Sequence, residues 1–474
     1  MSFPLRPALI ALVAITMATG GCSMAPKYVA PAPPVPESWP VGDAYLVQSE
    51  AGLPIVSYKD IFEDPGLQVL IEQALVNNRD LRIAAANVAA ARAQTRVVRA
   101  AQLPEVGVSA SAAHTERGGG NQAVLQRGGW TYNVQGGISS FELDLFGRLA
   151  NATQSQRNTA LATEASARTV RLSLVADLAL AWATYAADND LLEVAQSTAA
   201  NAEESLRLIT ARLRGGVAPR TDLRQAEQVL ETARGDVAVQ RAALAQDINA
   251  IRLLVGADFD KTLLPQSTVR VNDTLGVLPA GTSSQVLLRR PDVIAAEYDL
   301  KAANADIGVA RAQLFPTLSL TGLLGFASTS LSTLLKDDSF TASKRGDASW
   351  SIFNAGGRSA SVEVAKAQRD AALAAYEGAI QTAFREVSDA LADQGTLAER
   401  LRATTAFTSS AQDAARLTEA TYRQGIASSL DNLDAQRSLY TARRSEVVVR
   451  LQVAANRITL YRVLGGDQTS PVQE

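Results

Sequence analysis

The sequence predicts a mainly α-helical protein with a small β portion, in which one unit of long helices and β-hairpins occurs twice. Ten of the 17 prolines lie within residues 4–65, and residues 105–218 and 317–470 contain none. These proline-free stretches are rich in Ala, Leu, Arg, Gln and Glu, which favour helices. Residues 149–213 lack glycine as well, and a helix of that length would reach roughly 100 Å. Helices this long are typical of coiled coils.

The duplication is visible as two sets of matching positions. Residues 211–234 and 420–443 are identical at nine positions when they are aligned with an offset of 209. An offset of 212 aligns a second set of residues: Asp80 with Asp292, Arg99 with Arg311, and Pro104 with Pro316. Because the matches keep the same order in both halves, we infer that one unit is duplicated.

Each unit is predicted to run in the order helix, strand, polar loop, strand, very long helix, tight turn and helix. In the first unit the opening helix spans about residues 66–102 and ends before Pro104, as a proline requires. The last helix of the second unit carries an apolar residue at every seventh position: Leu433, Tyr440, Val447, Ala454 and Tyr461. We interpret this heptad row as a helix-packing surface.

Four short segments alternate apolar and polar residues, as strands with one apolar face do. They are residues 106–111 and 130–138 in the first unit, and 317–326 with a returning strand marked by Trp350 and Ile352 in the second. Small closed barrels need about eight strands. Lipid-facing hairpins from one chain must therefore combine with those of other chains. The alternative is two hairpins of a soluble sandwich, for which the sequence offers no further strands.

Composition excludes several classes of function. The chain has 45 Lys and Arg against 48 Asp and Glu, which gives a net charge of −3 and argues against a nucleic-acid binder. Cys22 is the only cysteine and His114 the only histidine, so a disulfide framework, a Cys/His metal site and a Ser-His-Asp triad are not expected. We therefore predict no enzyme, no metal site and no cofactor apart from a covalent lipid.

The first residues have the character of a secretory signal. Arg6 precedes an almost unbroken apolar run over residues 8–18, and small residues come directly before Cys22. This arrangement resembles a bacterial lipoprotein signal, in which the cysteine is acylated after cleavage. The next residue is Ser23 and not Asp, which resembles the lipoproteins that are sorted to the outer membrane. Cys22 is the predicted lipid attachment residue, and the proline-rich residues 30–36 are predicted to form an extended tether.

The order and spacing of the remaining motifs resemble the TolC-like outer-membrane factor family, in its lipoprotein branch of tripartite efflux systems. The motifs are Arg290-Pro291-Asp292, Phe353 with Gly356-Gly357-Arg358, Tyr422-Arg423-Gln424-Gly425, and Leu433-Asp434-Ala435-Gln436. The resemblance covers roughly residues 22–466. It implies a homotrimer with a 12-stranded β-barrel in the outer membrane and an α-helical tunnel through the periplasm. It also implies two partners, a periplasmic adaptor protein and an inner-membrane pump.

These features divide the chain into six segments. They are a signal peptide over 1–21, a lipidated N-terminal tether and equatorial segment over 22–65, repeat 1 over 66–256, an equatorial connector over 257–285, repeat 2 over 286–465, and a C-terminal tail over 466–474. The connector is distinguished from the repeats by Pro265, Pro279 and Gly281, which interrupt helices.

The tight turns at the helix tips are the predicted adaptor-contact sites. They are residues 214–219 and 423–428, and each contains a glycine that fits a left-handed helix C-terminus. Carried over from the resemblance, the adaptor-contact residues are Arg214, Gly216 and Val217 in the first tip, and Arg423, Gly425 and Ile426 in the second. We expect the tips to splay apart when the adaptor binds.

The second tip also carries the predicted periplasmic aperture. Leu430 and Asp434 are four residues apart, so they lie on one face of a helix. The resemblance makes Leu430 an apolar constriction, and Asp431 and Asp434 rings of carboxylates around the threefold axis. Repeat 1 has Gln225 in place of Asp434, whereas the spacing of Ser428 and Asp431 also fits a helix cap. For Asp431, both interpretations stay open.

The predicted function is passive conduction of small molecules such as drugs from the pump and adaptor to the exterior. A duct for secreted polypeptides is an alternative with the same architecture. A second alternative is a lipoprotein that braces the envelope without a pore. The aromatic residues Trp130, Tyr132 and Trp350 argue against the brace, because such a protein needs no lipid-facing aromatics.

Overall fold

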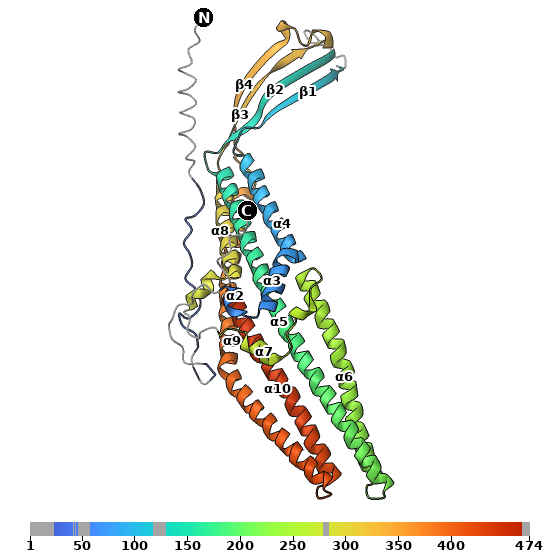
Figure 1. The fold of residues 1–474 in the computed structure, drawn as a ribbon. Helices are drawn as coiled ribbons and strands as arrows, with labels where there is room; N and C mark the ends of the chain where they lie inside the picture. The colour runs from blue at the N-terminus through green and yellow to red at the C-terminus, as the bar shows by residue number, and fades with distance from the viewer. Residues whose placement is uncertain are drawn as a thin grey trace. The chain divides into compact units, whose positions relative to one another are not determined.

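A computed structural model describes residues 23–40, 42, 44–45, 57–116, 129–277 and 284–466. Within these ranges the protein is mainly helical, with one four-stranded sheet (Figure 1). The predicted signal peptide, the predicted lipid attachment residue Cys22 and most of the predicted polar loop in the first unit lie outside the described residues.

Two pairs of helices and one sheet account for most of the fold. The helices α5 (Arg148–Arg214) and α9 (Gly357–Arg423) have 67 residues each, and they are followed by α6 (Arg220–Val255) and α10 (Ser429–Val463). The shorter segments are α2 (Tyr58–Ile61), α3 (Pro65–Asn77), α4 (Arg79–Ala100), η1 (Lys261–Leu263), α7 (Thr268–Asp273), η2 (Ser284–Arg289), α8 (Pro291–Ala312), η3 (Leu331–Thr333) and η4 (Asp337–Ser339).

The helix bounds confirm the duplication. Both ends of α5 and α9 differ by 209, from 148 to 357 and from 214 to 423. Both ends of α4 and α8 differ by 212, from 79 to 291 and from 100 to 312. The predicted heptad row in α10 is buried or half-buried along its whole length, as a packing surface must be.

The sheet joins the two repeats in the order β1-β2-β3-β4, with every neighbouring pair antiparallel. The strands are β1 (Val106–Thr115), β2 (Gly129–Leu143), β3 (Thr317–Ser328) and β4 (Phe340–Ser349). Within the described residues β1 and β4 are the edge strands, and each has one side without a paired neighbour.

The strand register gives the sheet one apolar and one polar face. Paired residues share a face, and successive residues alternate between faces. One row of the apolar face therefore contains Val108, Gly136, Leu324 and Ala342. A row of the opposite face contains Ser109, Gln135, Gly325 and Thr341. This separation confirms the predicted alternation and extends it across all four strands.

The chain divides into two compact units. One comprises the described residues of Met1–Ala32, Asn87–Glu164 and Ala295–Tyr376, and includes the sheet. The other comprises those of Pro33–Ala86, Ala165–Ile294 and Glu377–Glu474, and includes the helix tips. Among the described helices, α5 is long enough to cross a membrane and contains an 18-residue window that is apolar enough, and half of this window is buried inside the protein.

Two predicted elements were wrong in their bounds. The opening helix is broken at Asn78, whose side-chain oxygen accepts the backbone N–H groups of Asp80 and Leu81 at 2.8 and 3.1 Å and so starts a new helix, α4. The returning strand β4 ends at Ser349, one residue before Trp350. The Trp350 indole donates to the carbonyl of Leu314 at 3.0 Å, beyond the sheet ladder.

The described part of the predicted tether, residues 23–40, contacts the helices at several points. Asn304 donates to the carbonyl of Pro26 at 2.8 Å, and the hydroxyl of Ser284 donates to the carbonyl of Pro36 at 2.7 Å. Trp39 is buried and stacks on Phe384 with the ring centroids 5.0 Å apart. Proline keeps this segment extended, and side chains from the helices supply the hydrogen bonds that an extended chain cannot make internally.

Candidate functional site: the paired helix tips

The first tip joins α5 to α6 through a Schellman motif. Val217 donates its backbone N–H to the carbonyl of Arg212 at 3.0 Å, and Gly216 donates to Leu213 at 3.0 Å. These bonds satisfy carbonyls that the end of the helix would otherwise leave unpaired. Gly216 has φ +75°, so the backbone adopts the left-handed conformation that the sequence predicts for it.

The second tip joins α9 to α10 through the same motif. Ile426 donates to the carbonyl of Thr421 at 3.0 Å, Gly425 donates to Tyr422 at 3.0 Å, and Gly425 has φ +79°. Apart from the adjoining backbone, no atom of the described residues lies within 4 Å of the position that a Cβ would take at Gly425 or Gly216. The backbone conformation, and not packing, therefore favours glycine at both tips.

The helices that follow the two tips start differently. Pro219 precedes α6 and provides no side-chain cap, whereas Ser428 begins a capping box in α10. The Ser428 hydroxyl oxygen accepts the N–H of Asp431 at 3.1 Å, and the Asp431 carboxylate accepts the N–H of Ser428 at 3.3 Å. Asp431 therefore caps its helix, as one of its two interpretations predicts.

An apolar cluster next to the tips packs the two helix pairs together. It contains Ile209 of α5, Ala226 of α6, Tyr422 of α9 and Leu433 of α10, all at most 3% exposed. Because each of the four helices supplies one member, moving one hairpin relative to the other would expose this apolar surface to water.

Polar contacts also cross between the hairpins. The Arg212 guanidinium donates to the carbonyl of Tyr422 at 2.8 Å and lies 4.3 Å from the centroid of its ring. Farther from the tips, Gln436 donates to the Ser205 hydroxyl at 3.3 Å. Tyr440 in α10 donates to a carboxylate oxygen of Asp236 in α6. These contacts fix the relative positions of the two hairpins within one chain.

The predicted aperture residues lie on the exposed side of α10. Leu430 is 50% exposed, whereas Leu433 between the aperture residues is buried. Asp434 accepts a hydrogen bond from Arg437 at 2.7 Å, and both side chains are exposed to solvent. Sequence reasoning missed Arg437, although its position three residues after Asp434 is the usual spacing of a helical ion pair.

The predicted adaptor-contact residues differ in their surroundings. Val217 and Ile426 are 76% and 75% exposed at the ends of the two tips. Arg423 forms ion pairs with Glu419 at 2.6 Å and Glu204 at 3.3 Å. Each tip therefore presents an exposed apolar side chain to solvent.

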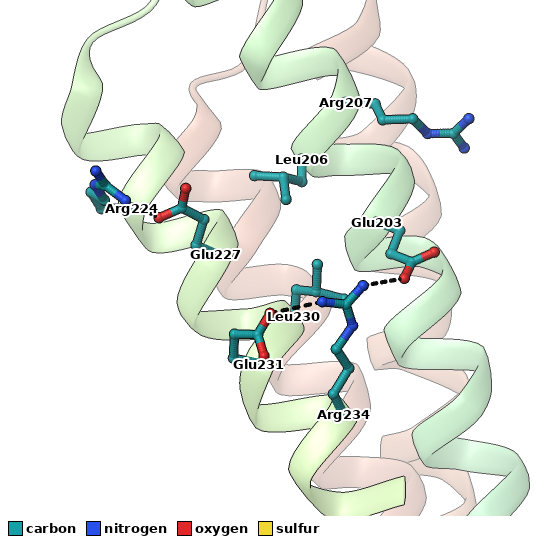
Figure 2. A pocket seen from close by; sticks show the side chains of 8 residues that line it. All are labelled: Glu203, Leu206, Arg207, Arg224, Glu227, Leu230, Glu231 and Arg234. Atoms are coloured by element: carbon teal, nitrogen blue, oxygen red, sulfur yellow. Dashed lines mark hydrogen bonds and ion pairs between the residues drawn. The ribbon is translucent and has the colours of Figure 1, made fainter.

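A groove of about 770 Å³ lies between α5 and α6, next to the first tip (Figure 2). Arg234 spans it and pairs with Glu203 at 2.7 Å and Glu231 at 2.8 Å. The other lining residues are Leu206, Arg207, Arg224, Glu227 and Leu230. Three Arg and three Glu balance in charge, so the groove attracts neither anions nor cations strongly.

A smaller cavity of about 190 Å³ lies next to the second tip, with Tyr422, Arg423 and Asn432 in its lining. Asn432 is 2% exposed, and its side-chain oxygen has no hydrogen-bond partner among the described residues. Repeat 1 has Leu223 in the equivalent position. Sequence reasoning missed Asn432, for which this break in the repeat was the available signal.

Two carboxylates interact on the first helix pair. Burial, together with the neighbouring charge of Asp188, raises the pKa of Asp247 to about 7. Burial also raises the pKa of Asp188. Asp247 lies in α6 and Asp188 in α5, so a shared proton would join these two helices.

The comparisons with known proteins place the chain in a family. Residues 70–257 and 282–466 match the family described as outer membrane efflux protein. The two matched ranges correspond to the two copies of the duplicated unit. The chain belongs to this family, whose members are transport channels.

Named relatives match over nearly their full length. The antibiotic efflux pump outer membrane protein ArpC of Pseudomonas putida is 39% identical over 462 residues, which are 97% of this chain and 95% of that protein. The cation efflux system protein CusC of Escherichia coli K12 is 37% identical, over 95% of this chain and 98% of that protein. The solved open-state structure of the Neisseria gonorrhoeae MtrE outer membrane channel is 32% identical. It has a TM-score of 0.83 and covers 96% of this chain and 100% of that one.

Proposed function

We propose that the chain is the outer-membrane channel component of a tripartite efflux pump and conducts small molecules such as drugs passively to the exterior. The full-length likeness to efflux pump outer membrane proteins is the observation that carries this proposal. The chain works with a periplasmic adaptor and an inner-membrane pump, as outer-membrane components of such pumps do. The relatives named for antibiotics and for cations differ in cargo, which fits a duct whose substrates are chosen by the pump.

The functional form we propose is a homotrimer. The sheet has an apolar face for lipid and a polar face for a water-filled interior, and among the described residues its two edge strands lack a neighbour on one side. If β4 of each copy pairs with β1 of the next, three copies make a closed barrel of 12 strands, which removes every exposed edge.

The proposed aperture lies at the second tips of the three copies. Leu430 forms the constriction, and Asp434 with Asp431 lines it with carboxylates that repel one another and hold cations. Support comes from the exposure of Leu430 and from the hydrogen bonds and apolar cluster that hold the hairpins in one arrangement. Adaptor contact at Val217 and Ile426, both exposed, would splay the tips.

A lipid on Cys22 is the proposed membrane anchor. Ser23, the next residue, donates to the side-chain oxygen of Asn151 at 2.8 Å, near the start of α5. This contact supports an anchor close to the strands, because β2 ends at Leu143, eight residues before Asn151. Mass spectrometry of the purified mature protein would test the lipid, and an unmodified Cys22 would contradict it.

The aperture is tested by single-channel conductance in planar bilayers. We expect Leu430→Ala to raise conductance severalfold because the constriction widens, and Asp434→Ala to abolish block by divalent cations because the carboxylate ring is lost. The matched controls are the equivalent residues of repeat 1, Thr221→Ala and Gln225→Ala, which should behave as wild type. Unchanged conductance and unchanged cation block in both test variants would contradict the aperture assignment.

A further inference from the structure

One cation lies on the apolar face of the sheet. The register pairs Val106 with Ile138, Ile138 with Gly322, and Gly322 with Lys344, so these four residues share a row of that face. The rows on either side contain Leu320, Gly346, Leu324 and Ala342. Lys344 is therefore surrounded by apolar and small side chains on the surface that the proposed function turns towards lipid.

The charge of Lys344 is not neutralised within the described part of the chain. Lys344 forms no ion pair or hydrogen bond there. On the opposite face of the same strand, Arg345 pairs with Asp347 at 2.6 Å. No acidic residue of the four strands lies on the apolar face, so pairing of β4 with β1 of a second copy also brings none from that strand.

Along β4, Lys344 lies closer to the end of the sheet that bears the β3–β4 turn than to the opposite end. Phe340 is four residues away, roughly 13 Å along the strand, whereas Trp350 is six residues away, roughly 20 Å. Phe340 is at the end that bears the β3–β4 turn, where His114 and Trp130 also lie on this face with ring centroids 5.0 Å apart. Aromatic residues of this kind mark the level of lipid headgroups.

Lysine can cover about half of that distance. Its flexible four-carbon stem can lie along the apolar surface and carry the ammonium roughly 6 Å towards the turn end. Local thinning of the bilayer around the charge brings the headgroups the rest of the way. The row contains Gly322, and apart from its chain neighbours no atom in the described part of the chain lies within 4 Å of the position that a Cβ would take there. A Lys stem or a lipid chain can therefore lie flat against this part of the sheet.

We propose that Lys344 binds the phosphate of an anionic lipid in the leaflet at the turn end of the sheet. This inference rests on the proposed function, because it requires the apolar face to contact the membrane. A cation exposed to hydrocarbon is costly unless it finds a counter-charge, and an anionic headgroup supplies one. The site thereby sets a lipid preference for the channel at a position separate from the aperture.

Native mass spectrometry of the detergent-purified full protein tests the proposal. The probes are phosphatidylglycerol and lipid A as anionic lipids, phosphatidylcholine as a zwitterionic lipid, and inorganic phosphate as a free competitor. We expect Lys344→Leu to lower the apparent affinity for both anionic lipids about tenfold and to leave phosphatidylcholine unaffected. Lys344→Arg should retain the preference. Lys336→Leu, which removes another exposed lysine of the same hairpin, should bind lipid as wild type does.

Equal binding of anionic lipids by wild type and Lys344→Leu would overturn the proposal. Displacement of the lipid by millimolar inorganic phosphate would also overturn it, because the site would then bind free phosphate. The proposed function is assessed separately, by single-channel recording of the wild-type protein in bilayers of each lipid. The absence of channels in every lipid would contradict the function itself, whereas channels without lipid discrimination in the mass spectra contradict only the lipid site.

Discussion

In each repeat a side chain next to the start of a short helix, α4 or α8, donates a hydrogen bond to the end of α6 or α10. The two repeats use different side chains for this bond. In repeat 1 the Asn78 amide donates to the carbonyl of Leu254 at 2.8 Å. In repeat 2 the Arg290 guanidinium donates to the carbonyl of Val463 at 2.9 Å. The two bonds are equivalent, because Asn78 and Arg290 differ by 212 and their acceptors by 209, the same offsets that relate the repeats.

Only the second of these contacts introduces a charge. Arg290 is 7% exposed and pairs with Asp292 at 2.7 Å and Glu386 at 2.9 Å. A neutral amide completes the same connection in repeat 1 with a helix cap and one further bond. The duplicated backbone thus accommodates either an arginine or an asparagine at this position. The buried arginine requires acidic residues to balance its charge, whereas the neutral asparagine does not.

The largest predicted effect is the loss of Arg290. We expect Arg290→Met to lower the free energy of unfolding by about 2–4 kcal/mol, because it leaves two carboxylates without their partner, although both are partly exposed to solvent. Asn78→Ala should cost about 1–2 kcal/mol, for one cap and one bond. Chemical unfolding of the detergent-purified protein measures both, and a larger cost for Asn78→Ala would reverse the comparison.

The carboxylate pair predicts a pH-dependent difference between the repeats. Asp247 has a pKa of about 7 in the folded protein, above its ordinary value of 3.8, so the folded state binds this proton more tightly. The resulting stability is fully present below about pH 4 and is lost as the pH rises through about 7. Asp247→Asn should therefore stabilise the protein by about 1–2 kcal/mol at pH 8, after allowance for solvent screening, with little effect at pH 4.

The reverse exchange provides the control for this pH effect. The counterpart of Asp247 in repeat 2 is Asn456, which is buried and donates to the carbonyl of Ala390 at 2.8 Å. Asn456→Asp should destabilise the protein more at pH 8 than at pH 4. Thermal unfolding at both pH values measures each exchange, and an effect of Asp247→Asn that is the same at pH 4 and pH 8 would contradict the raised pKa.

The smallest predicted effect is at the helix tips. Ser428→Ala removes the cap of α10 and should cost about 1 kcal/mol locally. Hydrogen exchange of the Asp431 amide should then become severalfold faster, because its hydrogen bond to Ser428 is lost. Pro219→Ala, at the equivalent position before α6, removes no side-chain cap and should leave amide exchange in the first turn of α6 nearly unchanged. Equal changes at both tips would contradict the difference in capping.

The large features of the fold could be predicted because each has a local cause. Proline-free, alanine-rich runs produce the long helices, glycine at the tips permits their left-handed ends, and period-two alternation over 317–326 produces a strand with one apolar face. The duplication could also be recognised from the sequence, because the offsets of 209 and 212 between matching residues are constant over whole helices.

The unpredicted features depend on contacts between distant residues. At the break, Asn78 caps α4 locally, and its amide also donates to the carbonyl of Leu254, which is 176 residues away along the chain. At the candidate site, the burial of Asn432 results from packing among α5, α9 and α10, and the spacing of residues along α10 alone does not predict it. Lys344 looks like an ordinary surface charge until the strand register places it on the apolar face.

The segment that starts at Ser23 is held against the helices by several hydrogen bonds. It is held by Asn151 of α5, by Asn304 of α8 and by the Tyr28 hydroxyl, which donates to Glu297 at 3.1 Å. Gly308 leaves room for it, because a Cβ there would come within 2.7 Å of the backbone nitrogen of Ala25. The backbone at Ser23 is therefore fixed within hydrogen-bonding distance of the first turn of α5.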